Sequence, residues 1–310
     1  MPAVAPDPVT DASYRPMPAS AAGPMAAEIS YASAARSRGG RAVIRLLENA
    51  TGRLSMIRRA AGFEAELAQG RSFWDVMPER YGLSLDLIAG SLADIPRTGP
   101  LVVIANHPFG ILDGLMMGHL MRRTRGDFRI LANSVFRQAP ALEPVLLPIS
   151  FDQTKAAVQL NLDTRSRALR YLADGGAIAV FPGGTVSTSA RAFSRPMDPG
   201  WRSFTAKMIA RSGAAVVPVY FDGQNSRLFQ LASHAHTNLR LGLLISEFKA
   251  RIDRPVRIAI GAPIAPQVLA PLATDPIAMM DFLRTTTYDL SPAPQPSYAL
   301  GHEFEAARRG

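Results

Sequence analysis

The sequence contains no cysteine, and this absence removes several kinds of chemistry at once. A disulfide framework, a thiolate nucleophile, a Cys-ligated zinc and an iron–sulfur cluster are all excluded for these 310 residues. Histidine is scarce, with five residues, so a site built on histidine has few candidates. Aromatic residues make up only 7% and do not alternate with basic clusters, which disfavours nucleic acid as a partner.

Long apolar runs are also missing. A transmembrane helix needs about 20 consecutive apolar residues. A run such as Leu115–Met121 is far shorter, and it is interrupted by Gly118 and His119. The N-terminus has neither the basic nor the apolar region of a signal peptide. We therefore expect neither a transmembrane helix nor a signal peptide.

Motifs for nucleotides, hydrolases and metals are lacking as well. Neither a phosphate-binding loop of the G-x-x-x-x-G-K-[ST] type nor a G-x-G-x-x-G after a strand occurs, and no G-x-S-x-G nucleophile turn is found. His234 and His236, two residues apart, share a face only on a strand, and no acidic third ligand is near them in sequence. We predict no metal and no cofactor.

The chain does have an excess of positive charge. Lys and Arg number 34 against 25 Asp and Glu, a formal charge of +9. This indicates an anionic partner, such as an acidic lipid surface, a phosphorylated ligand or nucleic acid. The apolar fraction of 47% is ample for a packed core.

Composition and periodicity divide the chain into four parts. Residues 1–40, rich in Ala, Pro and Ser, predict a disordered leader, and residues 291–310 a poorly ordered tail. Residues 41–92 predict a helical lead-in, and 93–290 the main domain. Within the lead-in, residues 41–66 place apolar residues at helical spacing with arginines between them. Such a segment either lies at an anionic membrane surface or packs on the core with a solvated basic face.

The main domain alternates short apolar runs with helical patterns. This alternation predicts an α/β fold: a single domain with a mixed, largely parallel sheet flanked by helices. Gly52 is expected to split the lead-in into two helices. The expected strands are 101–105, 128–131, 145–149, 177–181, 215–221 and 256–260, and the expected helices 111–123, 153–172, 201–212 and 277–288.

The most informative segment is LVVIANHPFGILDG, residues 101–114. A buried strand ends at Ala105, and Asn106 and His107 follow it, where functional residues of α/β proteins gather. Two residues six positions apart on one helix would point in opposite directions. His107 therefore meets Asp113 only if the histidine precedes the helix and the loop folds back. The pair would then act as a general base with an orienting carboxylate.

A structural interpretation of the same residues stays open. A histidine in a turn, followed by an aspartate at a helix start, also satisfies the helix dipole without any catalysis. In the functional interpretation, backbone N–H groups near Gly110 would stabilise an oxyanion. Proton transfer by such a pair requires neither a metal nor a cysteine.

NHPFGILDG resembles the His–Asp motif of the glycerolipid acyltransferase superfamily, which includes the 1-acylglycerol-3-phosphate acyltransferases. FRILANSVFR (Phe128–Arg137), FPGGTVS (Phe181–Ser187) and VVPVYFDG (Val216–Gly223) resemble its further blocks, in the family's order. The resemblance covers about residues 41–265. It implies the family's fold and O-acyl transfer, with His107 as the base and Asp113 as its partner.

Two departures from the family pattern matter. Five residues separate His107 from Asp113, where the family usually has four, and Gly183 and Val186 replace a glutamate and an arginine associated with the acceptor's glycerophosphate. Together with FDGQNSRLFQLASH they resemble a bacterial subgroup, often labelled hemolysin-like, that includes acyltransferases of lyso-ornithine lipids.

The expected site surrounds the His–Asp pair. Thr185 and Ser187 in the FPGG turn would approach a polar head group, although a turn with a Thr or Ser helix cap looks the same in sequence. Arg227 with Asn225 would bind a carboxylate or phosphate, unless Arg227 is a solvated surface residue. The expected substrate-binding residues are Asn106, Gly110, Phe181, Pro182, Gly183, Gly184, Thr185, Ser187, Asn225 and Arg227.

The resemblance implies a membrane-lipid enzyme. The acceptor would be a lysolipid, of lyso-ornithine or lysophospholipid type, and the donor acyl carrier protein or coenzyme A carrying the acyl group as a thioester. The protein would lie peripherally on the cytoplasmic side of the membrane. A non-catalytic lipid-binding protein on the same fold, or a thioesterase that uses His107 to activate water, are the alternatives.

Overall fold

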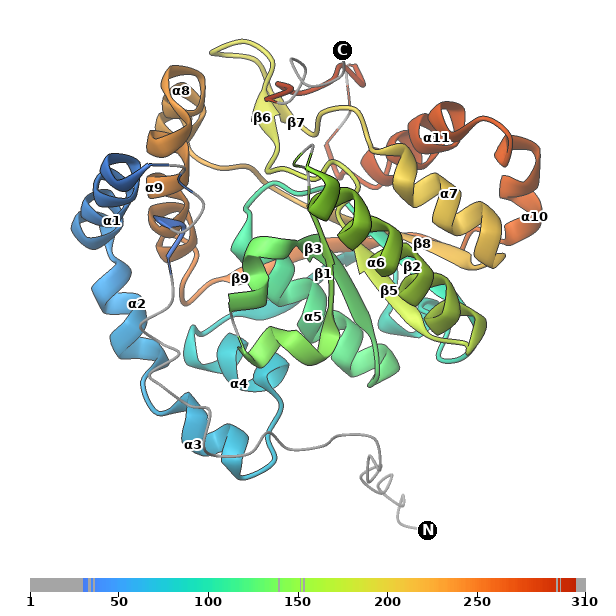
Figure 1. Ribbon diagram of the computed structural model, residues 1–310, viewed down its shortest axis with the longest axis horizontal. Helices are drawn as coiled ribbons and strands as arrows, with labels where there is room; N and C mark the ends of the chain where they lie inside the picture. Colours follow the sequence, from blue (N-terminus) through green and yellow to red (C-terminus); the bar gives the residue numbers. More distant parts are fainter. Residues whose placement is uncertain are drawn as a thin grey trace.

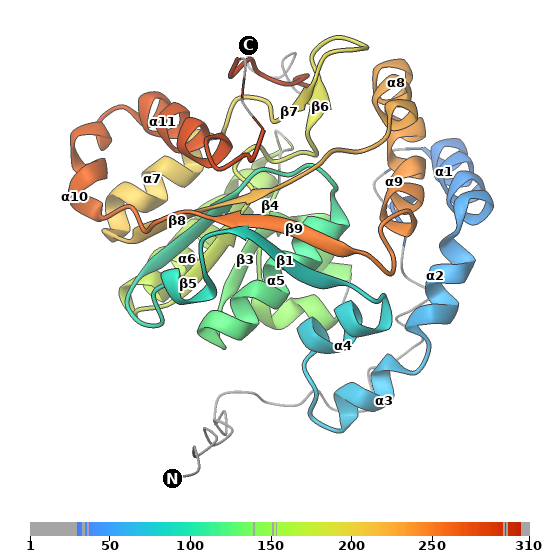
Figure 2. The same cartoon turned by 180° about the vertical axis from the view of Figure 1, so that it is seen from behind.

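The computed structural model describes residues 30–32, 35, 37–138, 140–150, 152, 154–293, 295 and 297–304. A seven-stranded sheet in the order β1-β9-β8-β2-β5-β3-β4 forms its centre (Figures 1 and 2). All neighbouring strands are parallel except β8 and β9. The strands are β1 (Ser84–Ala89), β2 (Leu101–Ala105), β3 (Arg129–Asn133), β4 (Leu146–Ile149), β5 (Ala177–Val180), β8 (Ala215–Phe221) and β9 (Pro255–Ile260), and β6 (Thr188–Ser189) pairs with β7 (Pro196–Met197) in a separate hairpin.

Helices cover both faces of the sheet, as the strand composition requires. Alternate side chains of β2 enter two different cores: Val103 and Ala105 face one core, and Val102 and Ile104 the other. A strand buried on both faces reads as a continuous apolar run. The helices are α1 (Arg38–Thr51), α2 (Arg53–Ala60), α3 (Phe63–Ala68), α4 (Phe73–Arg80), α5 (Ile111–Arg125), α6 (Lys155–Ala173), α7 (Ser203–Ser212), α8 (Arg227–Ala235), α9 (Thr237–Lys249), α10 (Pro266–Leu269) and α11 (Pro276–Tyr288).

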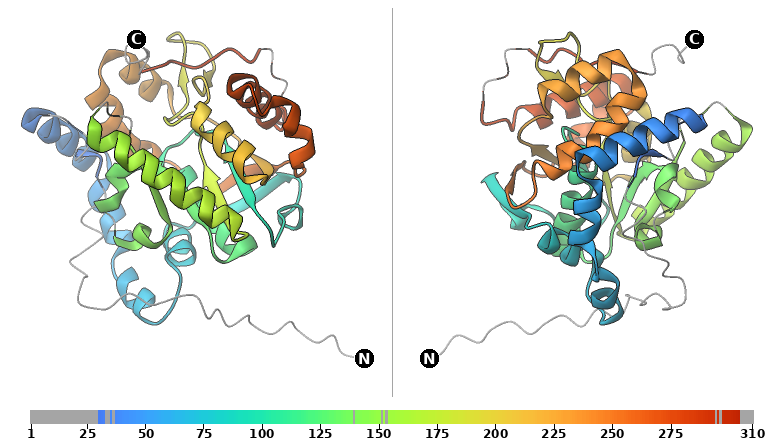
Figure 3. Two further views of the ribbon diagram at one scale, coloured as in Figure 1. Left: turned by 45° about the vertical axis from the view of Figure 1, so that its right-hand side comes forward. Right: turned by 90° about the vertical axis from the view of Figure 1, so that its left-hand side faces the viewer.

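The layers follow from these cores. Helices α4, α5 and the end of α9 pack against the first face of the sheet, and α6, α7 and α11 against the second. Figure 3 (left) shows α6, α7 and α11 together on that second face. The predicted α/β domain with a mixed, largely parallel sheet is confirmed. No described helix has the length and hydropathy needed to cross a membrane.

The lead-in region departs from its predicted start. Gly52, with φ 135°, separates α1 from α2 as expected. Helix α1 begins at Arg38, inside the predicted leader, and Ser30 and Tyr31 bind the buried Glu48: the Ser30 hydroxyl and the Tyr31 N–H each donate to it at 2.6 Å. Residues 1–29 of the predicted leader lie outside the described residues.

Two further elements differ from the sequence expectations. Residues 297–304, part of the predicted tail, pack along the β6–β7 hairpin: the Gly301 N–H donates to the Asp198 carbonyl at 2.9 Å and the His302 N–H to the Thr188 carbonyl at 3.0 Å. Strand β1 and helices α8 and α9 were not predicted. Strand β1 lies at the sheet edge with mostly exposed residues, within the range 41–92 that was expected to be a helical lead-in.

Candidate active site

The loop between β2 and α5 brings His107 and Asp113 together. Gly110, with φ 88°, turns the chain into α5, and Asp113 lies in the first turn of that helix. The N–H groups of Phe109 and Gly110 donate to Asp113 Oδ2 at 2.7 and 3.0 Å. His107 Nδ1 lies 3.0 Å from the same oxygen. The loop therefore folds back as the spacing predicts.

Asp113 is completely buried, whereas the His107 side chain keeps 18% of its surface exposed. Burial raises the pKa of the Asp113 carboxyl above its usual value, while the contact with His107 and the N–H groups of Phe109 and Gly110 act in the opposite direction. With Nδ1 held at the carboxylate, Nε2 is the ring nitrogen left for a substrate. This is the arrangement of a general base with its orienting acid.

The N–H groups of Phe109 and Gly110 are not available to bind an oxyanion. Sequence reasoning assigned the N–H groups near Gly110 to an oxyanion, but those of Phe109 and Gly110 are used to hold Asp113. They hold Asp113 in place beside His107 instead.

The loop after β5 forms the other wall of the site. The Phe181 ring stacks on the His107 ring, with centroids 4.3 Å apart and planes 26° apart. The Ser187 N–H donates to the His107 carbonyl at 2.8 Å. The expected FPGG turn and the His107 loop are therefore in direct contact.

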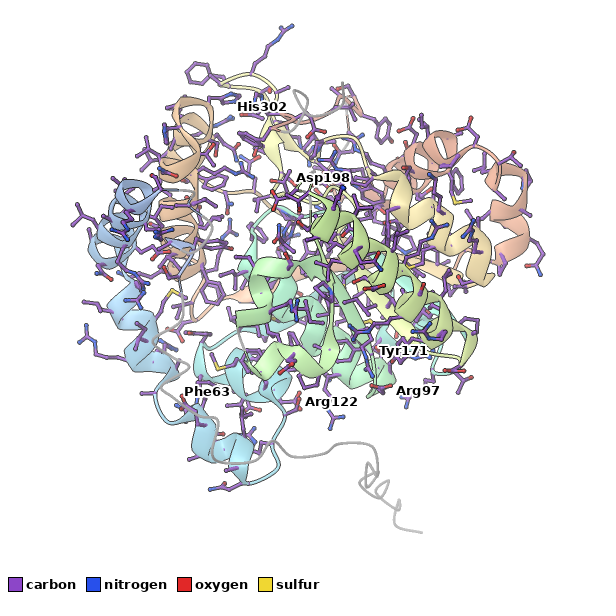
Figure 4. The ribbon with its side chains drawn as sticks, viewed as in Figure 1. Phe63, Arg97, Arg122, Tyr171, Asp198 and His302 are labelled. Atoms are coloured by element: carbon purple, nitrogen blue, oxygen red, sulfur yellow. The ribbon has the colours of Figure 1, made fainter. Side chains whose placement is uncertain are left out.

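Asp198, which sequence reasoning missed, joins these two loops. Its carboxylate is fully buried and accepts hydrogen bonds from the His107 N–H, at 3.2 Å, and from the Ser187 hydroxyl. Its other oxygen accepts from Trp201 Nε1 at 2.9 Å. Figure 4 shows Asp198 and His302 toward the end of the molecule that carries the β6–β7 hairpin. Asp198 follows β7 in a segment without a recognisable motif, so only the fold reveals its place.

The remaining predicted residues of the two loops have structural partners. The Asn106 amide is bonded in both directions to the Phe221 backbone, at 2.9 and 2.7 Å, and so ties β2 to β8. The Pro182 carbonyl accepts from the Arg202 N–H at 2.9 Å. A Cβ on Gly183 would lie 3.3 Å from the Asp198 carboxylate, and Gly184 is exposed with φ 69°.

Thr185 leads to a second residue that sequence reasoning missed. Arg240, from α9, donates to the Thr185 hydroxyl at 3.0 Å and to the Val186 carbonyl at 2.8 Å. The expected pair of Asn225 and Arg227 is not formed: Asn225 is buried, and exposed Arg227 donates to the Ser194 carbonyl at 3.2 Å. Because α9 was not predicted, no sequence signal indicated Arg240.

His234 lies on α8, His236 lies between α8 and α9, and the two have separate partners. His234 Nε2 contacts the Ser189 carbonyl at 2.9 Å, and His236 caps the start of α9. Within the described part of the chain, no group of three or more His, Asp or Glu residues is arranged to hold a metal ion.

The family profile described as Acyltransferase matches residues 53–293, and so spans both loops of the site. The chain belongs to the acyltransferase family. The resemblance seen in the His–Asp, FPGG and VPV blocks is thereby confirmed, and the protein is an enzyme that transfers acyl groups.

Two relatives match this acyltransferase over 207 residues each. It is 27% identical to a lyso-glycine lipid O-acyltransferase of Phocaeicola vulgatus over 207 residues, which cover 64% of this chain and 71% of the relative. It is 25% identical to a protein of the same name from Bacteroides thetaiotaomicron, with 64% and 73% covered. Among solved structures, the 1-acyl-sn-glycerophosphate acyltransferase of Thermotoga maritima matches with a TM-score of 0.44 and 15% identity, over 85% of this chain and 87% of that one.

Proposed function

We propose that this acyltransferase moves a fatty acyl chain from a thioester to the hydroxyl of a lysolipid. The observation that carries the proposal is the contact of partly exposed His107 with buried Asp113, in which Nδ1 lies 3.0 Å from Oδ2. The names of the two curated relatives support a lysolipid acceptor.

His107 acts first as a base and then as an acid. Nε2 removes the proton of the acceptor hydroxyl, and the resulting alkoxide attacks the thioester carbonyl. The tetrahedral intermediate collapses, the C–S bond breaks, and the leaving thiolate takes the proton from the imidazolium. Asp113 stabilises the imidazolium between these steps, and the acyl group passes directly between substrates because the chain has no thiol to hold it.

The donor we propose is acyl carrier protein or coenzyme A loaded with a fatty acid. The basic charge of +9 favours association with either, since both are acidic. For the acceptor, the relatives' names favour an amino-acid lipid, of lyso-glycine or lyso-ornithine type, over a lysophospholipid. Neutral Gly183 and Val186, where a charged pair binds glycerophosphate in the resembling family, agree with that choice.

We further propose that α1 and α8 place the enzyme on an anionic membrane from the cytoplasmic side. Both helices pack on α9, and α1 lies across it (Figure 3, right). Leu46 on α1 and Leu228 on α8 are 71% and 64% exposed. The single acidic residue of α1 and α2, Glu48, is buried, so the exposed face of these helices is apolar and basic. Such a face suits anionic head groups.

The proposed reaction is tested with purified enzyme, a labelled acyl donor and a panel of lysolipids. We expect a labelled diacyl product with at least one lyso-amino-acid lipid and acyl-loaded carrier protein or coenzyme A. Free fatty acid as the sole product, with every acceptor, would indicate a thioesterase and contradict the proposal.

The membrane surface is tested separately by co-sedimentation with vesicles. We expect binding to vesicles rich in phosphatidylglycerol, weak binding to pure phosphatidylcholine, and loss of binding in Leu46→Glu. Leu162→Glu, on the exposed side of α6, is the matched control, since α6 covers the second face of the sheet. Equal binding of Leu46→Glu and Leu162→Glu would place the membrane contact elsewhere.

A further inference from the structure

Arg240 is a buried cation whose hydrogen-bond partners are all neutral. Its side chain, 5% exposed as a residue, extends from α9 toward the loop after β5. One guanidinium nitrogen donates to the hydroxyls of Thr188 and Ser233, and the other to the Thr185 hydroxyl and the Val186 carbonyl. These bonds orient the group but bring no negative charge to it.

No carboxylate of a described residue lies at ion-pair distance from Arg240. Nearby Glu303 contacts Arg202 at 3.2 Å, and Glu48 is held by the N-terminal segment. Burial lowers the pKa of Arg240 to about 9, so it stays charged near neutral pH. A buried charge is costly unless it is paired. The group would therefore gain from a bound anion.

The pKa of neighbouring His302 is also affected by the charge of Arg240. Burial lowers the pKa of the His302 ring, and the nearby His234 and Arg240 side chains lower it further, against a smaller opposing influence of Glu303.

Arg240 is connected to the catalytic pair through consecutive residues of one loop. It binds Thr185 and Val186, and the next residue, Ser187, donates its N–H to the His107 carbonyl. The rings of Phe304 and Phe229 lie 4.3 and 5.2 Å from the guanidinium carbon. Of the residues that bind Arg240, Thr185 is half-buried, and it lies beside exposed Gly184.

We propose that Arg240 and Thr185 bind the anionic head group of the acceptor, a carboxylate or a phosphate, and so select acceptors by charge. This inference rests on the proposed function, because it names the head-group subsite of the same reaction. The bound anion compensates the charge of the buried guanidinium, and the Thr185 hydroxyl, which accepts from Arg240, donates its own proton to the anion. The acceptor's hydroxyl then lies on the His107 side of the loop.

The test compares an N-(3-hydroxyacyl)glycine with its methyl ester, which differ in charge, and adds lysophosphatidate as an acceptor that carries a phosphate. For the wild type we expect kcat/KM to favour the free acid over the ester by about tenfold or more, as for a charge-assisted hydrogen bond. In Arg240→Gln we expect most of this preference to disappear through a higher KM for the acid. Arg240→Lys should restore part of it. Use of lysophosphatidate in place of the acid would identify phosphate as the recognised anion.

Controls separate a binding role from a structural one. An equal loss with acid and ester in Arg240→Gln would mean that Arg240 only holds the loop, and would overturn the inference. Thr185→Val, which leaves α9 intact, should reduce the preference by a smaller factor and covers the case in which Arg240→Gln does not fold. Arg211→Gln, an exposed arginine on α7, should keep the wild-type preference. Loss of preference in Arg227→Gln instead would assign recognition to α8.

Failure of the reaction itself would be recognised independently. If no lysolipid were acylated by the wild type, the proposed function would be wrong. Binding of an N-acylglycine without the 3-hydroxyl, against its methyl ester, would still test Arg240 by calorimetry. Tighter binding of the acid, lost in Arg240→Gln, supports the subsite, and equal binding of acid and ester rejects it.

Discussion

The two charged centres of this acyltransferase are built in opposite ways. Asp113 takes its partners from the residues just before it: the N–H groups of Phe109 and Gly110 and the ring of His107. Arg240 takes its partners from Thr185 and Thr188, more than fifty residues away in sequence, and from Ser233. One centre is a local loop, and the other is assembled by the fold.

The two centres differ in the charge of their partners as well as in how far away those partners lie in the sequence. The carboxylate of Asp113 has two N–H donors and the His107 ring at Oδ2, and these oppose the effect of burial, which still raises its pKa. The guanidinium of Arg240 has only neutral acceptors. We infer that the first centre is preorganised for chemistry, whereas the second is completed by the substrate that it selects.

The largest expected effect comes from breaking the local centre. His107→Ala removes the proposed base, and we expect acyl transfer to fall by about 10³-fold, within the range for general acid–base catalysis. The thermal midpoint should change little, since the ring is partly exposed. Rates with the labelled donor, together with thermal unfolding, make the measurement. Wild-type turnover in this variant would show that another residue is the base.

Asp113→Asn tests how His107 is oriented. The amide cannot stabilise an imidazolium, and its NH₂ can face the donating N–H groups, so we expect a loss of about 10²-fold. The raised pKa of Asp113 has a clear sign: as pH falls, the carboxyl takes up its proton above the value of about 3.9 of an unperturbed aspartate. Infrared difference titration should show this carboxyl, and its signal should be absent in Asp113→Asn. A midpoint below 3.9 would contradict the effect of burial.

Local patterns explain how much of the fold could be predicted. The strands at 101–105 and 215–221 were predicted with their observed bounds, because both are apolar runs buried on both faces of the sheet. Strand β1 and helices α8 and α9 were missed. Strand β1 lies inside the range expected to be helical, and the segment FDGQNSRLFQLASH resembles a family block, which hides the helix start that Ser226 caps.

The candidate site divides in the same way. The contact between His107 and Asp113 was predictable because a loop of five residues connects them, and its geometry needs only one fold-back turn. Asp198 and Arg240 were not, because β7 and α9 come to the site only through tertiary packing. Asn225 and Arg227 are the converse case: they are neighbours in sequence, but one is buried and the other exposed.

An intermediate effect is expected where the two loops are joined. Asp198→Asn replaces one acceptor oxygen by a donor facing Trp201 Nε1, Ser187 or the His107 N–H. A buried donor left without an acceptor costs about 1–3 kcal/mol of stability. We expect a lower thermal midpoint and acyl transfer reduced by about tenfold, because the His107 backbone loses a fixed position. Asp281→Asn, on the exposed side of α11, is the control. Unchanged activity with reduced stability would limit Asp198 to folding.

The smallest effect should come from removing one neutral partner of Arg240. Thr188→Val keeps the volume but deletes the hydroxyl that accepts from the guanidinium and donates to the Val186 carbonyl at 3.0 Å. We expect a stability loss of about 1 kcal/mol by denaturant unfolding, and a kcat within about threefold of wild type. Because the neutral bonds orient the guanidinium while the substrate supplies its charge partner, KM for an anionic acceptor should rise more than KM for its neutral ester. Equal changes in the KM for the anionic acceptor and the KM for its ester would mean that Thr188 supports only the β6–β7 hairpin and does not orient Arg240.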